Sequence, residues 1–252
     1  MLFSCCTVIG VRDGETSADL ARSIAKKSSQ KILNTGDDAL LVPPASSFAV
    51  NTILKTEGVP DNCSSLVMVN LRDSSSYNAS YSKPPFSIAA TVLDKLLEER
   101  ADRHVVFVSI SYHGEDGDNR SAKKIKEHMK HADRSTIINN EYSPSEIKGL
   151  ISQAEISIGT SYHFLLFSLS QNIPSLAIYQ DQYYKKKLVG LTKMYGQRDF
   201  CFNLKKLNSS ELLRISNEVI DLRPNISEDL SQINRDLNVK FKIAHDYILE
   251  IL

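Results

Sequence analysis

Short apolar segments alternate with amphipathic ones along most of the chain. Residues 66–71, 105–110 and 174–179 are apolar at nearly every position, and each run is too short to be a complete helix. Such runs are typical of strands buried on both faces of a parallel sheet, since half-exposed strands alternate apolar and polar residues. The stretch 86–100 between two of them carries apolar residues at helical spacing. The pattern predicts an α/β fold with a Rossmann-like parallel sheet and helices on both of its faces.

The first 64 residues contain a smaller version of the same alternation. An apolar run at 3–11 predicts a strand, and 17–27 predicts a helix whose apolar stripe is Leu20 and Ile24. A second apolar run at 39–42 predicts another strand. Residues 43–64 mix Pro, Ser, Thr, Asn and Gly, a composition typical of a linker.

One helix start in the second half of the chain has a specific signal. Ser143 and Glu146 have the spacing of a capping box, and Pro144 occupies the first helical position. This predicts a helix over 144–153. The same reasoning predicts further helices at 119–131, 161–171, 183–195, 209–221 and 227–251, and further strands at 135–138, 156–158 and 200–204.

Composition excludes several classes of protein. Thirty Lys plus Arg balance thirty Asp plus Glu, so the chain lacks the net positive charge that nucleic-acid binders carry. No apolar run approaches the roughly 18–20 residues that cross a bilayer. Four cysteines show neither a Cys-x-x-Cys pair nor a Cys/His metal spacing, which favours free thiols in a cytoplasmic protein without a metal site.

Candidate site residues follow the strands, because parallel strands bring their carboxyl ends to one edge of the sheet, where ligands bind. The segment formed by Gly159, Thr160 and Ser161 opens a predicted helix, and amide groups at a helix N-terminus attract anions. Together these groups would suit a ligand carrying phosphate or carboxylate. The polar groups in such positions are Arg12, Arg72, His113, Gly159, Thr160, Ser161, His163 and Lys187.

Each candidate also has an ordinary structural interpretation. Arg12 and Arg72 have acidic neighbours with which they could pair, and His163 could be a buried histidine bonded to backbone. Lys187 belongs to a run of lysines, which is most often a solvated helix face. The remaining histidines lie outside the inferred edge and are expected on the surface: His104, His128, His131 and His245.

Two stretches resemble the polysaccharide pyruvyl transferase family. Residues 143–196 are similar to its C-terminal signature, in which Gly-x-Arg-x-His opens a helix after a strand. Residues 8–20 resemble its Arg-Asp-x-x-Ser segment, and 35–42 the stretch that closes its first domain. The matching positions are Arg12, Asp13, Ser17, Gly159, His163, Pro174, Tyr179, Asp181, Lys187, Gly190 and Leu191.

The resemblance implies a GT-B-like architecture, in which two Rossmann-like domains face a cleft. It implies transfer of a pyruvyl group from phosphoenolpyruvate to a sugar in surface polysaccharide synthesis, with no cofactor. Arg12, Arg72, His163 and Lys187 would hold or protonate the donor, and His163 is the candidate acid/base because imidazole exchanges protons near neutral pH.

Two departures from the family pattern leave alternatives open. Ser161 stands where the motif has Arg, and Ser cannot form a bidentate contact with a carboxylate. In addition, family members usually have a first domain ahead of the Arg-Asp segment, which starts at residue 12 here. The expected division is a remnant of the first domain at 1–45, a linker at 46–64, a C-terminal Rossmann-like domain at 65–225 and a C-terminal helix at 226–252. A homo-oligomer or a partner that supplies the missing domain would complete the cleft. The alternatives are a GT-B nucleotide-sugar glycosyltransferase and a catalytically inactive binding or assembly module.

Overall fold

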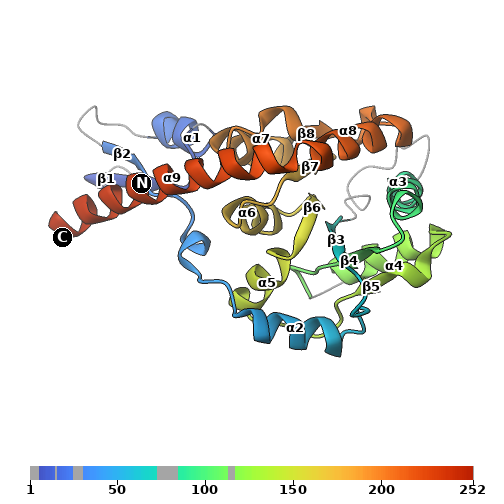
Figure 1. Ribbon diagram of the computed structural model, residues 1–252. Coiled ribbons are helices and arrows are strands. Elements are labelled where there is room, and N and C mark those ends of the chain that lie inside the picture. The colour runs from blue at the N-terminus through green and yellow to red at the C-terminus, as the bar shows by residue number, and fades with distance from the viewer. Residues whose placement is uncertain (1–5, 15, 25–30, 73–84, 113–116, 252) are drawn as a thin grey trace.

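The larger part of the chain is built on a parallel sheet of six strands. The computed structural model describes residues 6–14, 16–24, 31–72, 85–112 and 117–251. The strand order in the sheet is β5-β4-β3-β6-β7-β8, and every neighbouring pair is parallel (Figure 1). The strands are β3 (Ser65–Asn70), β4 (Arg103–Phe107), β5 (Ser135–Ile137), β6 (Ala154–Gly159), β7 (Ser175–Tyr179) and β8 (Cys201–Asn203).

Helices cover both faces of this sheet, as the sequence predicts. On one side α3 packs against α4 and α8, and on the other α5 packs against α2 and α6. All six residues of β3 are buried, which explains the uninterrupted apolar run that marks it in the sequence. The helices that connect or follow the strands are α3 (Pro85–Glu99), α4 (Asp118–His128), α5 (Pro144–Ile151), α6 (Tyr162–Ser170), α7 (Gln182–Met194) and α8 (Ser209–Asp221).

Helix α5 confirms the predicted capping box. The Ser143 hydroxyl accepts a hydrogen bond from the Glu146 amide at 3.3 Å, and the Glu146 carboxylate accepts one from the Ser143 amide at 2.8 Å. This reciprocal pair satisfies two amide groups that an uncapped helix would leave without partners. A local sequence signal is sufficient here because every group involved lies within one turn.

A second, two-stranded parallel sheet lies at the start of the chain. Strands β1 (Val8–Val11) and β2 (Lys31–Asn34) are joined by α1 (Thr16–Ile24), and a short 3-10 helix, η2 (Asp38–Leu41), follows. We call this segment, residues 6–42, the N-terminal unit, and the six-stranded sheet with its helices the sheet domain. The core of the N-terminal unit holds few buried residues: Ile9, Val11, Ala18 and Ala21.

Two expectations for the N-terminal unit are wrong. The predicted strand at 39–42 is η2 instead, because the Asp37 carboxylate accepts the Ala39 amide at 3.1 Å and starts a helical turn. The second strand is β2, at 31–34. Helix α1 buries Ala18 and Ala21, whereas Leu20, from the predicted apolar stripe, is 64% exposed. Small residues face the core there because α1 packs closely on α7 as well as on its own strands.

The segment expected to be a linker contains a helix, α2 (Ser47–Thr56). Ser46 caps its first turn by accepting the Ala49 amide, and Val50 and Ile53 face the core. Gly149 of α5 permits the close approach of the two helices, since a Cβ there would lie 2.9 Å from a methyl group of Val50. The composition of 43–64 hides this helix because its stability comes from packing rather than from strong helix formers.

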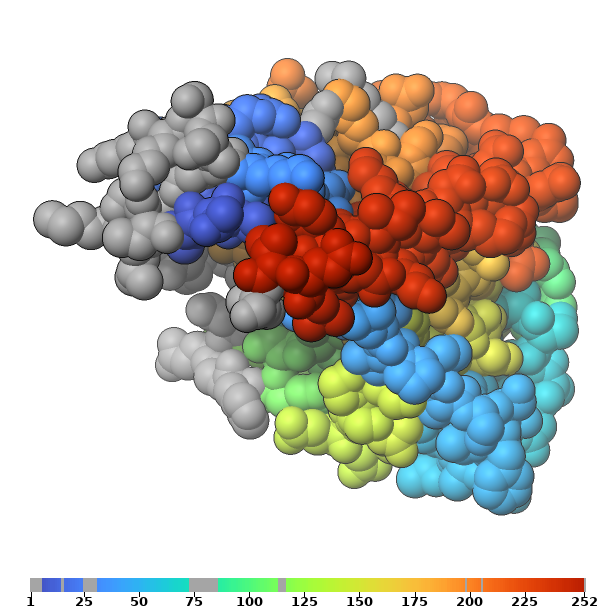
Figure 2. All heavy atoms as spheres, turned by 90° about the vertical axis from the view of Figure 1, so that its left-hand side faces the viewer, coloured from blue at the N-terminus to red at the C-terminus, as the bar shows by residue number. Residues whose placement is uncertain are grey.

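The last helix, α9 (Arg223–Glu250), connects the two parts of the molecule. It begins beside α8, passes α6 and reaches β2 (Figure 1). Seen from that end, its last turns lie against the N-terminal unit (Figure 2). Phe241 of α9 packs on Gly36, where a Cβ would lie only 2.7 Å from the ring. The chain therefore returns to its beginning and holds the N-terminal unit against the sheet domain.

One histidine expected on the surface is buried. His104 lies in β4 with 2% of its surface exposed, and its Nε2 is 2.9 Å from the Thr136 hydroxyl. The expectation was wrong because β4 begins at Arg103, two residues before the apolar run suggested. Burial, together with the charges of Lys126 and Arg134, lowers the pKa of His104 to about 4.

Candidate functional site

The candidate site lies at the carboxyl edge of the sheet, where β3 and β6 run side by side. The chain leaves β3 toward β4 and leaves β6 toward β7, so the two connecting loops diverge at this point, where ligands of such sheets bind. Thr160, just after β6, ties the two strand ends together. Its amide donates to the Asn70 carbonyl at 2.8 Å, and its hydroxyl accepts the Arg72 amide at 2.8 Å. Thr160 is therefore occupied in holding the loops rather than free to bind an anion through its hydroxyl.

Arg12 and His163 come together beside Asp37. The Arg12 guanidinium lies 4.2 Å above the centre of the Tyr162 ring, and its Nε is 3.9 Å from the Asp13 carboxylate. His163 is half exposed, and its Nε2 is 3.7 Å from the Asp37 carboxylate. The His163 side chain, opposed by burial and aided by the Ala39 amide and the charge of Arg12, holds the pKa of Asp37 below its ordinary value. The Asp37 carboxylate, the His163 ring and the Arg12 guanidinium therefore lie close together.

Arg72 belongs to a second group on the same edge. Its Nε donates to the Asp118 carboxylate at 3.0 Å. Burial by itself would lower the pKa of Arg72, but the contacts with Asp118 and the Tyr184 hydroxyl outweigh it and raise the pKa. Asp118 is buried and also accepts the Asn70 side-chain amide and the backbone amides of Ile110 and Ser111. The arginine is held in place by the strands' own loops.

The remaining candidate residues do not join either of these two groups. The Lys187 Nζ lies 4.1 Å from the centre of the Tyr183 ring on α7, and Tyr183 in turn stacks edge-on with Tyr184. Gly159 ends β6 beneath Phe164, where a Cβ would lie 2.5 Å from the ring, so its close approach is a packing requirement. Ser161 precedes α6, is nearly buried and makes no side-chain capping bond. His113 lies outside the described residues.

The segment 160–162 supports both arginines. Thr160 holds the Arg72 backbone, while the Tyr162 ring lies under the Arg12 guanidinium. One arginine is thus contacted through its guanidinium and the other through its backbone amide by the segment that opens α6. This arrangement offers positive charge at the helix N-terminus, where the helix dipole also favours an anion.

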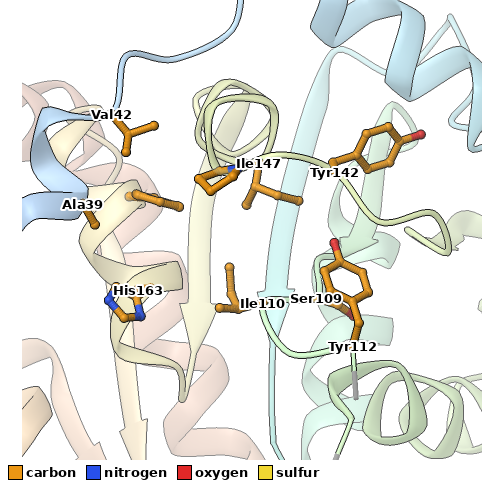
Figure 3. Close-up of a pocket in the computed structure, with 10 residues that line it drawn as sticks. Ala39, Val42, Ser109, Ile110, Tyr112, Tyr142, Ile147 and His163 are labelled. Carbon is orange, nitrogen blue, oxygen red and sulfur yellow. The ribbon is translucent and has the colours of Figure 1, made fainter.

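A cavity of about 300 Å³ opens beside His163 (Figure 3). Its polar groups come from Ser109, Tyr112, Tyr142 and His163, at the ends of β4 and α5 and on α6. Residues of η2 close it from the N-terminal unit, so both parts of the molecule contribute walls. The apolar side chains that line it are Ala39, Val42, Ile110, Pro144, Ile147 and Phe167.

Several residues that shape this site have no signal in the sequence. Lys148 is buried in α5, and its Nζ donates to the carbonyl groups of Leu40 at 3.1 Å and Val42 at 2.8 Å, which holds η2 in place. Burial lowers its pKa. Asp37 reads as part of a turn in the sequence, although it lies in the stretch 35–42 that resembles the family. Tyr162 and Asp118 likewise act through contacts between segments far apart in the chain.

The structure is a Rossmann-like α/β fold with a GT-B-like sheet domain. A family model for polysaccharide pyruvyl transferases matches residues 1–182, and the chain belongs to that family. This confirms the resemblance drawn from the motifs around Arg12 and His163. No curated protein sequence matches the chain significantly.

Three solved structures illustrate the similarity of fold. The S. aureus MnaA–UDP structure aligns with a TM-score of 0.60 and 12% identity over 90% of this chain and 55% of that one. A glycosyltransferase from Rickettsia africae gives 0.57 and 14% over 97% and 63%. HepE from Anabaena, in complex with UDP and glucose, gives 0.56 and 13% over 98% and 64%. The chain thus spans about half to two thirds of the length of these proteins, and at such identities the likeness shows the fold alone.

Two further features concern only the described part of the chain. Within it, no helix combines the length and the apolar character needed to cross a membrane. Within the same residues, His, Cys, Asp and Glu side chains form no cluster of three or more that could hold a metal ion.

Proposed function

We propose that this protein takes part in pyruvyl transfer from phosphoenolpyruvate to a sugar that presents two hydroxyl groups. Membership of the polysaccharide pyruvyl transferase family supports the reaction class. The observation that carries the proposal is the placement of His163, half exposed, within 3.7 Å of the Asp37 carboxylate and beside Arg12. A proton-transfer group and a cation then meet at one point of a crevice.

In this proposal His163 protonates the methylene carbon of phosphoenolpyruvate. A sugar hydroxyl attacks the neighbouring carbon, the bond from that carbon to the phosphate oxygen breaks, and a second hydroxyl closes a cyclic ketal. One hydroxyl proton replaces the proton that His163 delivered, and the other leaves with inorganic phosphate. Asp37 stabilises the protonated imidazole and fixes its orientation, as a carboxylate does beside a catalytic histidine.

The cations hold the anionic donor in the proposed reaction. Arg12 contacts Tyr162 and Arg72 contacts Thr160, so in this proposal one arginine binds the carboxylate and the other the phosphate of a single donor. Lys187 lies on α7, the helix that also places Tyr184 against Arg72. This supply of charge compensates for Ser161, which stands where the family motif has an arginine.

The inactive binding module remains a second candidate because of Ser161. Its side chain is nearly buried and carries no charge, so the donor loses a direct bidentate contact at this position. An inactive module would bind a donor or an acceptor without turnover.

The test measures phosphate release from phosphoenolpyruvate in the presence of sugar acceptors. We expect His163→Gln to lower kcat by about 10²–10⁴-fold, the range for loss of a general acid. The matched control is His128→Gln, which changes an exposed histidine on α4 and should leave kcat unaltered. Retained donor binding with no phosphate release from the unmodified chain would instead support the inactive module.

A further inference from the structure

We infer that Lys148 is a positioning residue for the proposed proton transfer, because it fixes η2 so that Asp37 stays beside His163. The inference rests on the proposed function and adds to it a residue on α5 that no motif of the sequence marks. The structure connects Lys148 to the other two residues through the backbone of η2.

The Lys148 side chain binds the end of η2. Its Nζ donates to the Leu40 carbonyl at 3.1 Å and to the Val42 carbonyl at 2.8 Å. Carbonyl groups in the last turn of a helix have no partner within the helix, so the ammonium satisfies them from outside. One side chain of the sheet domain therefore holds two consecutive turns of backbone in the N-terminal unit.

The burial of Lys148 indicates that this contact has a specific purpose. The residue is 3% exposed, and burial lowers the pKa of its ammonium. Within the described ranges it has no salt-bridge partner and relies on the two carbonyl groups. Burying a charged group is unfavourable unless it is hydrogen-bonded, and an apolar side chain would pack here at lower cost. The contribution of the ammonium is thus the fixed place of η2.

The beginning of η2 carries Asp37, whose two carboxylate oxygens have different contacts. Oδ1 accepts the Ala39 amide at 3.1 Å, and Oδ2 lies 3.7 Å from Nε2 of His163. Because Oδ1 is bound to the first turn of η2, the direction of Oδ2 follows the orientation of that turn. A shift of η2 would carry the carboxylate away from the imidazole that it orients in the proposed reaction.

Two neighbouring helices of the sheet domain contact η2. Helix α5 carries Lys148, helix α6 carries His163, and the two helices pack against each other. The Lys148 Nζ lies 5.8 Å from the centre of the Phe167 ring, which is one turn after His163 on α6. The large core fixes these helices relative to each other, whereas the N-terminal unit has a small core of its own. The place of Asp37 is therefore set by contacts with the sheet domain.

A second residue of α5 holds the chain beyond η2 and offers a comparison. The Ser145 hydroxyl donates to the Pro43 carbonyl at 2.7 Å, and the Ser145 carbonyl accepts the Ala45 amide at 2.9 Å. Both partners follow Val42, the last residue that Lys148 holds. Helix α5 thus contains one side chain that binds η2 and another that binds only the segment after it.

The experiment measures the pKa of Asp37 by carbon-13 NMR of its carboxyl group, which needs no turnover, and then kcat and KM for phosphate release. The ionisable groups around Asp37 are His163 and Tyr162 from α6 and Arg12 from the end of β1. The contact with His163 is the largest cause of the lowered pKa of Asp37. We expect Lys148→Met to raise this pKa and to lower kcat about ten- to hundredfold, with little change in KM for phosphoenolpyruvate.

Two variants serve as controls. Lys148→Gln removes the charge but keeps a donor for a carbonyl group, so both effects should be smaller than in Lys148→Met. Ser145→Ala removes only the bond to Pro43 and should leave the pKa of Asp37 and kcat unaltered. Amide hydrogen exchange in β1 and β2 of Lys148→Met should match that of the unmodified chain, because a positioning role does not require the N-terminal unit to unfold.

The inference is overturned if Lys148→Met leaves the pKa of Asp37 unchanged, or if Lys148→Gln equals Lys148→Met, which would show that the charge alone acts. Equal effects of Ser145→Ala, or lost protection throughout β1 and β2, would also overturn it. If Lys148→Met does not fold, Lys148→Gln decides: a raised pKa of Asp37 supports the inference, and an unchanged one overturns it. Failure of the proposed function looks different, since the NMR results would be as expected while the unmodified chain releases no phosphate.

Discussion

The N-terminal unit and the sheet domain are built on the same strand–helix–strand plan, yet they are stabilised in different ways. The sheet domain buries apolar side chains on both faces of six strands, and many of them are wholly inaccessible. In the N-terminal unit, the described residues form two strands and a core of four buried side chains. The burial of so small a core does not offset the conformational entropy lost when the segment folds. Contacts with neighbouring helices must therefore supply the remaining stabilisation.

Contacts with α7 and α9 hold the N-terminal unit, in addition to those of Lys148 with η2. The Thr16 hydroxyl donates to the Lys186 carbonyl at 2.9 Å, and Gly190 leaves room for the Asp13 carboxylate. The Lys31 ammonium lies 3.7 Å from the centre of the Tyr247 ring. The unit carries Arg12 and Asp37, so the candidate site depends on a segment whose own packing is modest. The candidate site therefore combines His163 and Arg72 of the well-packed sheet domain with Arg12 and Asp37 of the less well-packed N-terminal unit.

The largest expected effect compares the two cores directly. Leu96 of α3 is fully buried in the sheet domain, and Leu96→Ala should lower the free energy of unfolding by about 3 kcal/mol, through lost burial and a cavity. Ile9→Ala in β1 should cost about half as much, since the small core can relax or separate locally. Urea denaturation of both variants measures the difference. Equal losses would mean that the two parts unfold as a single cooperative unit.

A smaller effect is expected where α9 meets the N-terminal unit. Gly36→Ala places a side chain at φ +75° and against the Phe241 ring, and should cost about 2 kcal/mol. The change should raise amide hydrogen exchange over residues 31–42 and leave β3 and β6 protected. Gly58→Ala is the matched control: Gly58 has φ +80° but nothing within 4 Å of the added Cβ, so it reports backbone strain alone. If both variants lose the same free energy of unfolding and show the same hydrogen exchange, the packing of α9 on Gly36 contributes little to stability.

The smallest expected effect is a loss of stability at low pH that arises from His104 in the sheet domain. The folded protein binds no proton on His104 until the pH approaches about 4, while the unfolded chain binds one near pH 6.5. The unfolded state therefore takes up more protons in this window, and stability falls as the pH drops below 6.5. At pH 5.5 the loss should be about 1.4 kcal/mol relative to pH 7.5.

Denaturation at the two pH values tests this in His104→Gln, which cannot titrate but can still reach Thr136. We expect the unfolding free energy of His104→Gln to depend less on pH, with a slope smaller by up to one proton. The His128→Gln variant should keep the slope of the unmodified chain. An unchanged slope in His104→Gln would show that other groups control acid stability. Because His104 lies in β4, the acid effect should appear in the sheet domain first.

Prediction from the sequence was most accurate where the stabilising contacts are local or repeated. Helix α8 occupies the predicted residues 209–221, and the capping box fixes the start of α5. The buried strands were found because burial on both faces leaves an uninterrupted apolar run. Prediction failed at η2, which the Asp37 side chain caps, and at β2, which packs with the small residues of α1. It also failed at α2, which packs closely on Gly149 of α5.

The candidate site was predicted in part for the same reason. Strand ends locate Arg12, Arg72 and the loop after β6, since topology brings them to one edge. The partners that give those residues their character were not visible: Asp37 beside His163, Tyr162 under Arg12, and Asp118 on Arg72. Each pair joins residues at least 46 positions apart, so no local pattern contains both members.

The sequence by itself determined the parallel α/β sheet, the ends of its capped helices and the family motifs around Arg12 and His163. Tertiary structure alone decided which groups meet there: the contact of Asp37 with His163, the uncharged cavity that η2 closes, and the return of α9 to the N-terminal unit. The physical reason is the distance along the chain over which each kind of interaction acts. Hydrophobic periodicity and capping act within a few turns of the chain, whereas the charge and shape of a site depend on segments that only folding brings together.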